Sequence, residues 1–205
     1  MVAIIDYDAG NLKSVQKALQ KLGHEGVITR DFHTILEADH VVLPGVGSFG
    51  VAMKQLKLYE LDKMLLELVH QNTPLLGMCL GLQLLFDGSE ESEGIEGLHI
   101  LKGTIVKIPD AVGLKIPHIG WNSLDLQNEG RLFRDIPEQS YVYFVHSYYL
   151  KAKEESIVKA VTEYGVAIHA SVEWNNVFAC QFHPEKSSRI GLQILSNFMS
   201  VRGGK

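Results

Sequence analysis

The amino-acid sequence predicts an α/β fold, with a mostly parallel central sheet flanked by helices and an antiparallel extension. Two observations lead to this prediction. Short apolar segments alternate with helix-periodic segments in the first half of the chain, and strand-like segments follow one another in the second half. Strands that alternate with helices favour a parallel sheet covered on both faces, whereas successive strands favour antiparallel pairing.

The first half supplies four expected strands and three expected helices. The strands are short apolar segments, at 2–6, 27–29, 41–43 and 75–78. The helices are segments in which apolar residues recur every three or four positions, at 11–22, 56–69 and 80–86. Asn11 is expected to cap the first helix and Gly23 to end it.

The second half opens with segment 88–97, which is rich in Glu, Gly and Ser and is therefore expected to be a solvated loop. Strands are expected after it, at 104–108, 123–126, 141–146, 158–162, 168–173 and 178–182. Residues 174–176 are expected to form a hairpin turn, and 188–200 a final helix. Domains average about 150 residues, so residues 1–205 are expected to form a single domain.

Composition and charge exclude several classes of protein. The 24 acidic and 19 basic residues give a net charge of −5, and no basic block is present, so nucleic acid is disfavoured as a ligand. The apolar runs are shorter than the ~20 residues of a membrane span. Two cysteines cannot form a disulfide framework, and residues 1–6 do not resemble a signal peptide. A cytoplasmic protein with no membrane association is expected.

The segment Gly77–Gly81 places Cys79 between an expected strand and an expected helix. This is the pattern of a nucleophile elbow, with cysteine in the position of serine. The flanking glycines allow the strand and helix to approach closely, and the helix N-terminus favours a thiolate. The N–H of Leu80 would point toward an oxyanion on the attacked carbon. Cys79 is therefore a candidate nucleophile, with a buried core cysteine as the alternative.

A cysteine nucleophile needs a base, and the base needs a group that orients it. Among nine histidines, His183 stands out because His183-Pro184-Glu185 ends an apolar strand. Pro184 favours an extended conformation at His183, and side chains two apart on an extended segment share a face. His183 is therefore the candidate base and Glu185 the candidate orienting carboxylate.

Two other interpretations compete with this one. Cys180 and His183 have the spacing of a metal-ligand pair, but residues three apart on a strand face opposite sides, so Cys180 is expected in the core and no metal is expected. Segment 45–50 has the pattern G-x-G-x-x-G of a dinucleotide-binding loop. It follows the third expected strand, however, and no strand-end acid lies about 20 residues further on. No cofactor is therefore expected, and the glycines could instead turn a backbone N–H toward the thiol.

Together, segments 44–47, 77–83 and 183–185 resemble the class I (triad-type) glutamine amidotransferases, whose fold is flavodoxin-like. The resemblance extends from residue 5 to the last helix. Segments 6–12, 117–122, 143–148 and 183–187 resemble the branch of this family that serves histidine biosynthesis.

The resemblance implies hydrolysis of glutamine through a Cys79 glutamyl thioester. The ammonia would pass to a partner cyclase, a (β/α)8 barrel that makes imidazole glycerol phosphate and AICAR. The implied oxyanion hole comprises backbone N–H groups of Val46, Gly47 and Leu80. Gln83, four residues after Cys79 on the same helix face, is expected to bind substrate.

The resemblance also implies that backbone near Ser147 and Tyr148 holds the amino-acid end of glutamine. The candidates for the partner interface are Asn11, Trp121, Asn122 and Lys186. Glutaminase activity is expected to be low until the cyclase is occupied. The alternatives are an amidotransferase of another pathway, a cysteine peptidase-like or chaperone-like protein, and a dinucleotide-binding module.

Overall fold

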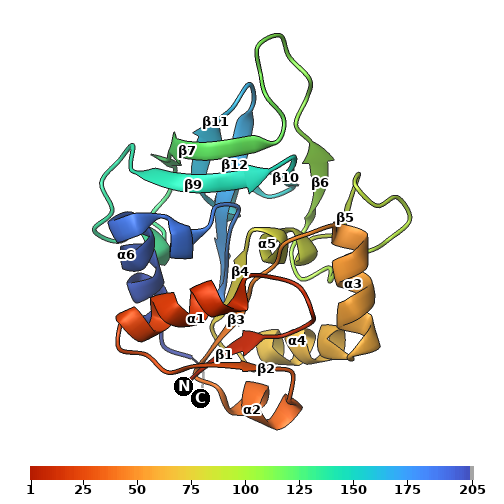
Figure 1. Ribbon diagram of the computed structural model, residues 1–205, viewed down its shortest axis with the longest axis vertical. Coiled ribbons are helices and arrows are strands. Elements are labelled where there is room, and N and C mark those ends of the chain that lie inside the picture. Colours follow the sequence, from red (N-terminus) through yellow and green to blue (C-terminus); the bar gives the residue numbers. More distant parts are fainter. Residues whose placement is uncertain (204–205) are drawn as a thin grey trace.

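The computed structural model describes residues 1–203. Its largest sheet has eight strands in the order β2-β1-β3-β4-β13-β12-β11-β8 (Figure 1). The first five strands of this order are parallel: β2 (Gly26–Thr29), β1 (Val2–Ile5), β3 (His40–Leu43), β4 (Leu75–Met78) and β13 (Val177–Cys180). The other three are antiparallel to their neighbours: β12 (Ala167–Trp174), β11 (Val158–Glu163) and β8 (Asp125–Leu126). The predicted parallel sheet with an antiparallel extension is confirmed.

Two smaller sheets complete the structure. One has the order β10-β6-β5, and the other pairs β7 with β9 in antiparallel register. Their bounds are β5 (Gly88–Ser89), β6 (Gly103–Lys107), β7 (His118–Ser123), β9 (Tyr141–His146) and β10 (Tyr148–Ala152). In Figure 1 the β7–β9 pair lies above the carboxyl end of the main sheet, away from both termini.

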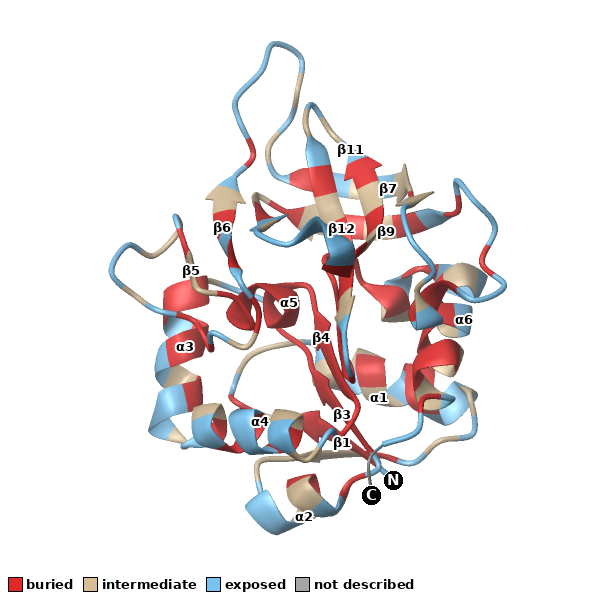
Figure 2. Cartoon of the chain, turned by 180° about the vertical axis from the view of Figure 1, so that it is seen from behind, coloured by how far each residue is buried: buried red, intermediate tan, exposed pale blue. Residues whose placement is uncertain are grey.

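Helices cover both faces of the main sheet because successive strand residues point to opposite sides. Ala3 and Ile5 pack in one core with α2 (Phe32–Glu37), α3 (Phe49–Leu58) and α4 (Leu61–His70). Val2 and Ile4 pack in a second core with α1 (Leu12–Lys21) and α6 (Ser188–Met199). Figure 2 shows the central strands as a buried layer between these helices. No helix within residues 1–203 is long and apolar enough to cross a membrane.

The predicted helix at 56–69 is confirmed for residues 61–69 but is wrong in its start, because residues 56–58 belong to a separate, earlier helix. α3 ends at Leu58, and α4 begins at Leu61 after Glu60 adopts a left-handed conformation with φ 56°. Apolar residues continue across this break because both helices bury one side against the sheet, so the periodicity alone does not reveal it. The predicted strand at 123–126 is likewise divided between the end of β7 and β8. Helix α2 and strand β10 were not predicted.

The prediction of a solvated loop at 88–97 is also wrong in part. Gly88 and Ser89 form β5, and Gly88 makes an isolated bridge to Glu96. Glu91 accepts a hydrogen bond from the N–H of Phe49 at 2.6 Å, and Ser92 accepts one from Gly50 at 3.0 Å. The segment therefore accepts hydrogen bonds from the free N–H groups at the start of α3. Its polar composition alone did not indicate this role.

Candidate active site

Cys79 occupies the sharp turn between β4 and the short helix α5 (Leu80–Leu84), as predicted for an elbow. Its backbone has φ 55° and ψ −111°, a strained conformation for a residue with a side chain. A Cβ at Gly77 would lie 2.7 Å from the carbonyl oxygen of Gly81, and a Cβ at Gly81 would collide with the carbonyl oxygen of Leu43. The two glycines therefore allow the close approach that holds Cys79 in the turn.

His183 lies beside this turn because β13 pairs with β4 in parallel, with Cys180 opposite Met78. The chain leaves β13 three residues before His183, and the N–H of Cys79 donates to the carbonyl of Cys180 at 2.8 Å. Sequence-distant motifs thus meet at the carboxyl end of two adjacent strands, where ligands bind in open α/β sheets.

The side chains of His183 and Glu185 are paired, as predicted, with 2.9 Å between Nδ1 of His183 and Oε1 of Glu185. Both residues were predicted to lie on one extended segment, and this is correct only for His183. His183 is extended, with φ −103° and ψ 96°, but Glu185 lies in the 3-10 turn η3 (Pro184–Lys186) and not on an extended strand. The turn brings the carboxylate within hydrogen-bond distance of Nδ1 of His183.

The protonated form of His183 is stabilised by this environment. Burial acts to lower the pKa of His183, but Cys79 and Glu185 outweigh it and raise the pKa to about 9. Nε2 of His183 has no hydrogen-bond partner among the described residues, so it is available on the side of the ring opposite Glu185. The arrangement provides a nucleophile, a proton carrier and an orienting carboxylate.

Cys180 is fully buried in the second core, as the sequence predicts. Burial raises the pKa of its thiol well above the ordinary value, and the nearby Glu185 and Cys79 add to this effect. No group of three or more His, Cys, Asp or Glu side chains within residues 1–203 is placed to hold a metal ion. Cys79 lines a cavity, whereas Cys180 is 0% exposed.

A cavity of about 320 Å³ opens over Cys79. It brings together most of the predicted site residues from four parts of the chain. Its lining includes Val46, Gly47, Cys79, Leu80, Gln83, Ser147, Tyr148 and His183. Glu185 lies beneath the site and is almost completely buried, with 2% of its side chain exposed.

The glycine loop after β3, residues 44–47, is held by Tyr7 at Pro44 and Gly45 and has open space at Gly47. A Cβ at Gly45 would collide with the hydroxyl of Tyr7 and lie 2.9 Å from Cβ of Leu80. The same hydroxyl donates to the carbonyl of Pro44 at 2.8 Å. Gly47 has φ +100° and open space around it. These packing and conformational requirements account for Gly45 and Gly47 without a bound dinucleotide.

Three polar side chains of the cavity region were not predicted from the sequence. Gln181 accepts a hydrogen bond from Gln83 at 3.1 Å, and its Nε2 lies 3.9 Å from Sγ of Cys79. His146 and Glu91 line the cavity itself. Gln181 lies between the singled-out Cys180 and His183, and strand alternation could have placed it opposite Cys180. Nothing local in the sequence distinguishes Glu91 from its acidic neighbours.

The predicted interface residues are spread along the same end of the molecule. Trp121 is 50% exposed on β7, and its ring meets that of Tyr143 edge-on. Lys186 is exposed in η3, which contacts α1. The side chain of Asn11 caps α1 by accepting from the N–H of Ser14, as predicted. Asn122 donates to the carbonyl of Glu163 at 2.9 Å, so its side chain has a structural bond within the chain.

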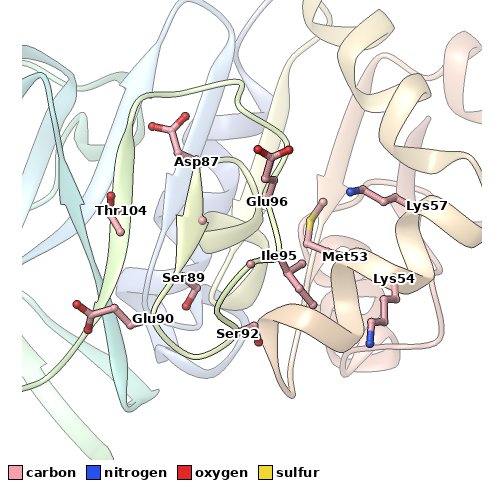
Figure 3. Close-up of a pocket in the computed structure, with 12 residues that line it drawn as sticks. Met53, Lys54, Lys57, Asp87, Ser89, Glu90, Ser92, Ile95, Glu96 and Thr104 are labelled. Carbon is pink, nitrogen blue, oxygen red and sulfur yellow. The ribbon is translucent and has the colours of Figure 1, made fainter.

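A larger cavity of about 740 Å³ lies between α3, β5 and β6. Figure 3 shows Lys54 and Lys57 on one side of it and Asp87, Ser89 and Glu90 on the other. Its described lining contains neither cysteine nor histidine. It therefore offers no nucleophile and base, and the smaller cavity over Cys79 is the better candidate for an active site.

Comparisons with known proteins agree with this geometry. Residues 3–201 match the family described as Glutamine amidotransferase class-I. The chain is 49% identical over 197 residues to "Imidazole glycerol phosphate synthase subunit HisH" of Moorella thermoacetica, covering 96% of this chain and 93% of that protein. It is 46% identical over 201 residues to the protein of the same name from Methanocaldococcus jannaschii, covering 98% and 100%.

Solved structures share the fold at low sequence identity. A structure titled "Crystal structure of glutamine amidotransferase" superposes with a TM-score of 0.75 at 19% identity, covering 97% of this chain and 100% of that chain. "Structure of PurLQS from Thermotoga maritima" gives a TM-score of 0.72 at 18% identity, covering 97% and 96%.

Proposed function

Because the chain belongs to the class-I glutamine amidotransferase family, we propose that it is the glutaminase subunit of an imidazole glycerol phosphate synthase. It hydrolyses glutamine to glutamate and ammonia, and a partner cyclase uses the ammonia in histidine biosynthesis. The observation that carries this proposal is the cavity that contains Cys79 and His183 over a buried Glu185. The names of the two relatives supply the pathway.

The reaction begins when the thiol of Cys79 gives its proton to Nε2 of His183 and Sγ attacks the side-chain carbonyl carbon of glutamine. The resulting tetrahedral intermediate collapses, the C–N bond breaks, and His183 gives its proton to the departing ammonia. Water then adds to the glutamyl thioester with His183 as the base, the C–S bond breaks, and glutamate leaves. Glu185 keeps the Nδ1 proton on His183 and stabilises the charged ring.

The negative charge on the substrate oxygen needs N–H donors near Cys79. Leu80, the first residue of α5, supplies one, and the Val46–Gly47 segment supplies the other. Both line the cavity. Gly47 has a positive φ, and a Cβ added there would meet no atom within 4 Å, so the Val46–Gly47 peptide has room to rotate while the Tyr7 bond holds Pro44. This freedom is consistent with low activity until a partner fixes the loop.

The amino-acid end of glutamine binds at the far side of the cavity. Gln83 and the backbone of Ser147 and Tyr148 hold it there. Glu91 is the one acidic side chain among the lining residues that the structure describes, so its carboxylate is suited to the α-ammonium group. The side of the cavity formed by Gln83, Ser147 and Tyr148 thus receives the α-carboxylate of glutamine, and the carboxylate of Glu91 receives its α-ammonium group.

The partner cyclase, a (β/α)8 barrel, binds over the outer face of β7 and β9. We define the β7–β9 outer face as Ile119, Trp121, Tyr141, Tyr143 and Val145. Ile119, Trp121 and Tyr141 are among the most exposed large apolar residues of the chain. Val145 also lines the cavity, and its carbonyl lies 3.9 Å from Sγ of Cys79. A barrel seated here would receive ammonia directly from the site.

Asn11, Asn122 and Lys186 border this contact in the proposal. The assembly is a cytoplasmic heterodimer in which the chain contributes one glutaminase domain and the barrel contributes the cyclase active site. Ammonia crosses between the two sites through a channel, and occupation of the cyclase raises the glutaminase rate. Together the two subunits carry out the lyase reaction.

Product formation by the complex tests the proposed function. The chain is mixed with its cyclase and the cyclase substrate, and imidazole glycerol phosphate is measured with either glutamine or ammonium chloride as nitrogen source. The wild-type chain is expected to support both reactions. Cys79→Ala is expected to support only the ammonium reaction. A wild-type complex that uses ammonium but not glutamine would contradict the proposal.

A further inference from the structure

Two buried histidines form a directed hydrogen-bond chain behind the cavity. His118 on β7 is paired with His146 on β9, with 3.1 Å between Nδ1 of His118 and Nε2 of His146. Nδ1 of His146 lies 2.9 Å from the carbonyl oxygen of Tyr148. A carbonyl only accepts, so Nδ1 of His146 carries the proton and its Nε2 accepts. Nδ1 of His118 must therefore be the donor to His146.

The outer end of the chain is held by packing. The ring of His118 stacks between Phe144, at a centroid distance of 4.8 Å, and Tyr164, at 3.8 Å. Nδ2 of Asn122 lies 3.5 Å from Nε2 of His118. Burial lowers the pKa of His118 to about 4 and that of His146 to about 3. Both rings are neutral near pH 7, so the direction of the hydrogen bonds is fixed.

The inner end of the chain is the peptide of Tyr148. Its carbonyl accepts from His146 and also from Nε2 of Gln83, at 3.1 Å. The neighbouring carbonyl of Ser147 accepts from Ile108, and Tyr148 is paired with Lys107 of β6. Hydrogen-bonded pairs alternate in an antiparallel ladder, so the C=O and N–H of Tyr148 both point away from β6.

We propose that His118 and His146 are positioning residues that orient the Tyr148 peptide for the amino-acid end of glutamine. This inference rests on the proposed glutaminase function. His146 lines the cavity with Cys79, yet it does not serve as the base. Both of its nitrogens are engaged, one by Tyr148 and the other by His118, whereas Nε2 of His183 is unpaired among the described residues.

This role predicts a selective effect on substrate binding. Loss of the His146 ring removes one of the two hydrogen bonds to the Tyr148 carbonyl, and loss of the His118 ring removes the bond that orients His146. Neither change touches the His183–Glu185 pair, because that pair is bonded within its own segment. The KM for glutamine should therefore rise while kcat changes little. A purely structural role would lower the amount of folded enzyme without changing KM, and a role as base would lower kcat.

The test uses the complex with its cyclase and measures kcat and KM for glutamine. We expect His146→Leu to raise KM about tenfold or more and to change kcat less than about threefold. His146→Asn keeps a donor near the position of Nδ1 and should recover most of the loss. His40→Leu is the control, since His40 is a buried histidine that bonds the carbonyl of Val201 and should leave KM unchanged.

For His118, His118→Asn should retain the donor to His146, and His118→Leu should raise KM less than His146→Leu does. An unchanged KM in both leucine variants overturns the proposal, as does a fall in kcat at constant KM. A wild-type complex without glutaminase activity would instead count against the proposed function, so the two failures are distinguishable.

Nitrogen-15 NMR of the histidine side chains gives a second measurement on the wild-type chain, should a leucine variant not fold. The proposal expects His146 neutral at pH 7, with its proton on Nδ1, and the same tautomer for His118. A protonated His146, or a proton on its Nε2, overturns the proposal.

Discussion

Nδ1 of His183 and Oε1 of Glu185 lie 2.9 Å apart, and their side chains are only 4% and 2% exposed. A carboxylate buried this deeply is stable when it is paired with a donor that carries positive charge. The pair therefore favours an imidazolium, which is the form of His183 that the proposed mechanism needs in order to protonate departing ammonia.

Replacement of Glu185 by Gln keeps the shape of the side chain but removes its charge. We expect kcat for glutamine hydrolysis to fall about 10²–10⁴-fold, because the ring loses the group that stabilises its charged form. The measurement is a steady-state assay in the complex. Glu173→Gln is the control, because Glu173 is a carboxylate paired with Arg131 outside the site, and full activity is expected there. Equal losses in both variants would contradict the assignment.

The same pair predicts how stability changes in alkaline solution. The pKa of His183 is raised to about 9, above its ordinary value, so its contribution to stability is complete below about pH 6.5. The contribution is lost as pH rises through about 9. Urea unfolding at pH 6.5 and pH 9 should show a larger loss for the wild type than for Glu185→Gln. A larger loss in the variant would show that Glu185 does not raise this pKa.

The buried, neutral rings of His118 and His146 are expected to give stability the opposite pH dependence, with a loss in acid. Burial lowers their pKa values to about 4 and about 3, so they bind protons more readily in the unfolded chain. The stability associated with these neutral rings is complete above about pH 6.5 and is lost as pH falls toward 4. Protonation of these two rings in the unfolded chain should therefore lower the unfolding free energy by about 4 kcal/mol between pH 7.5 and pH 5, about 2 kcal/mol for each ring. Replacement of both rings by Asn should reduce this drop.

The close packing of Gly81 predicts that a single added methyl group destabilises the fold at the elbow. A Cβ there would collide with the carbonyl oxygen of Leu43, which is strand backbone and cannot move aside. Gly81→Ala should cost about 3 kcal/mol or more in unfolding free energy, or prevent folding. Gly88→Ala is the matched control, because its Cβ would meet only ordinary contact at 3.5 Å. Similar stability of the two variants would show that the close approach is not required.

A comparison of variants at the two tryptophans distinguishes a loss of partner binding from a general effect of removing an exposed aromatic side chain. Trp121 lies on the β7–β9 outer face, whereas Trp174 lies beside Val177 at the amino end of the parallel strands. Both are partly exposed, at 50% and 40%. Trp121→Ala should weaken cyclase binding by about 2 kcal/mol or more, and Trp174→Ala should not. Calorimetric titration with the cyclase checks this, and equal affinities for the two variants would place the interface elsewhere.

The parallel sheet and the positions of Cys79 in a sharp turn and of His183 beside Glu185 were predictable, because each depends on local patterns. Buried strands are continuous apolar segments, and Gly77–Gly81 specifies its turn through glycines that no other residue could replace. The break at Glu60 was not predictable, since a left-handed residue between two amphipathic helices leaves the apolar spacing unchanged. The predicted contact between His183 and Glu185 is present, although a turn and not a strand produces it.

The rest of the cavity depends on tertiary pairing that the sequence does not display. His146 reaches Tyr148 only because β9 ends beside the start of β10, and Glu91 reaches the cavity only because its loop caps α3. Gln181 contacts Gln83 because β13 lies next to β4. In the sequence alone, nothing distinguishes these three side chains from other polar residues.

Covalent labelling tests the central claim, that Cys79 is the nucleophile toward glutamine. The chain with its cyclase is incubated with the glutamine-mimicking alkylator 6-diazo-5-oxo-L-norleucine, and the adduct is mapped by peptide mass spectrometry. The account predicts one adduct, on Cys79, which excess glutamine prevents and Cys79→Ala abolishes, while Cys180 stays unmodified. An adduct on Cys180, or no adduct at all in the complex, would contradict it.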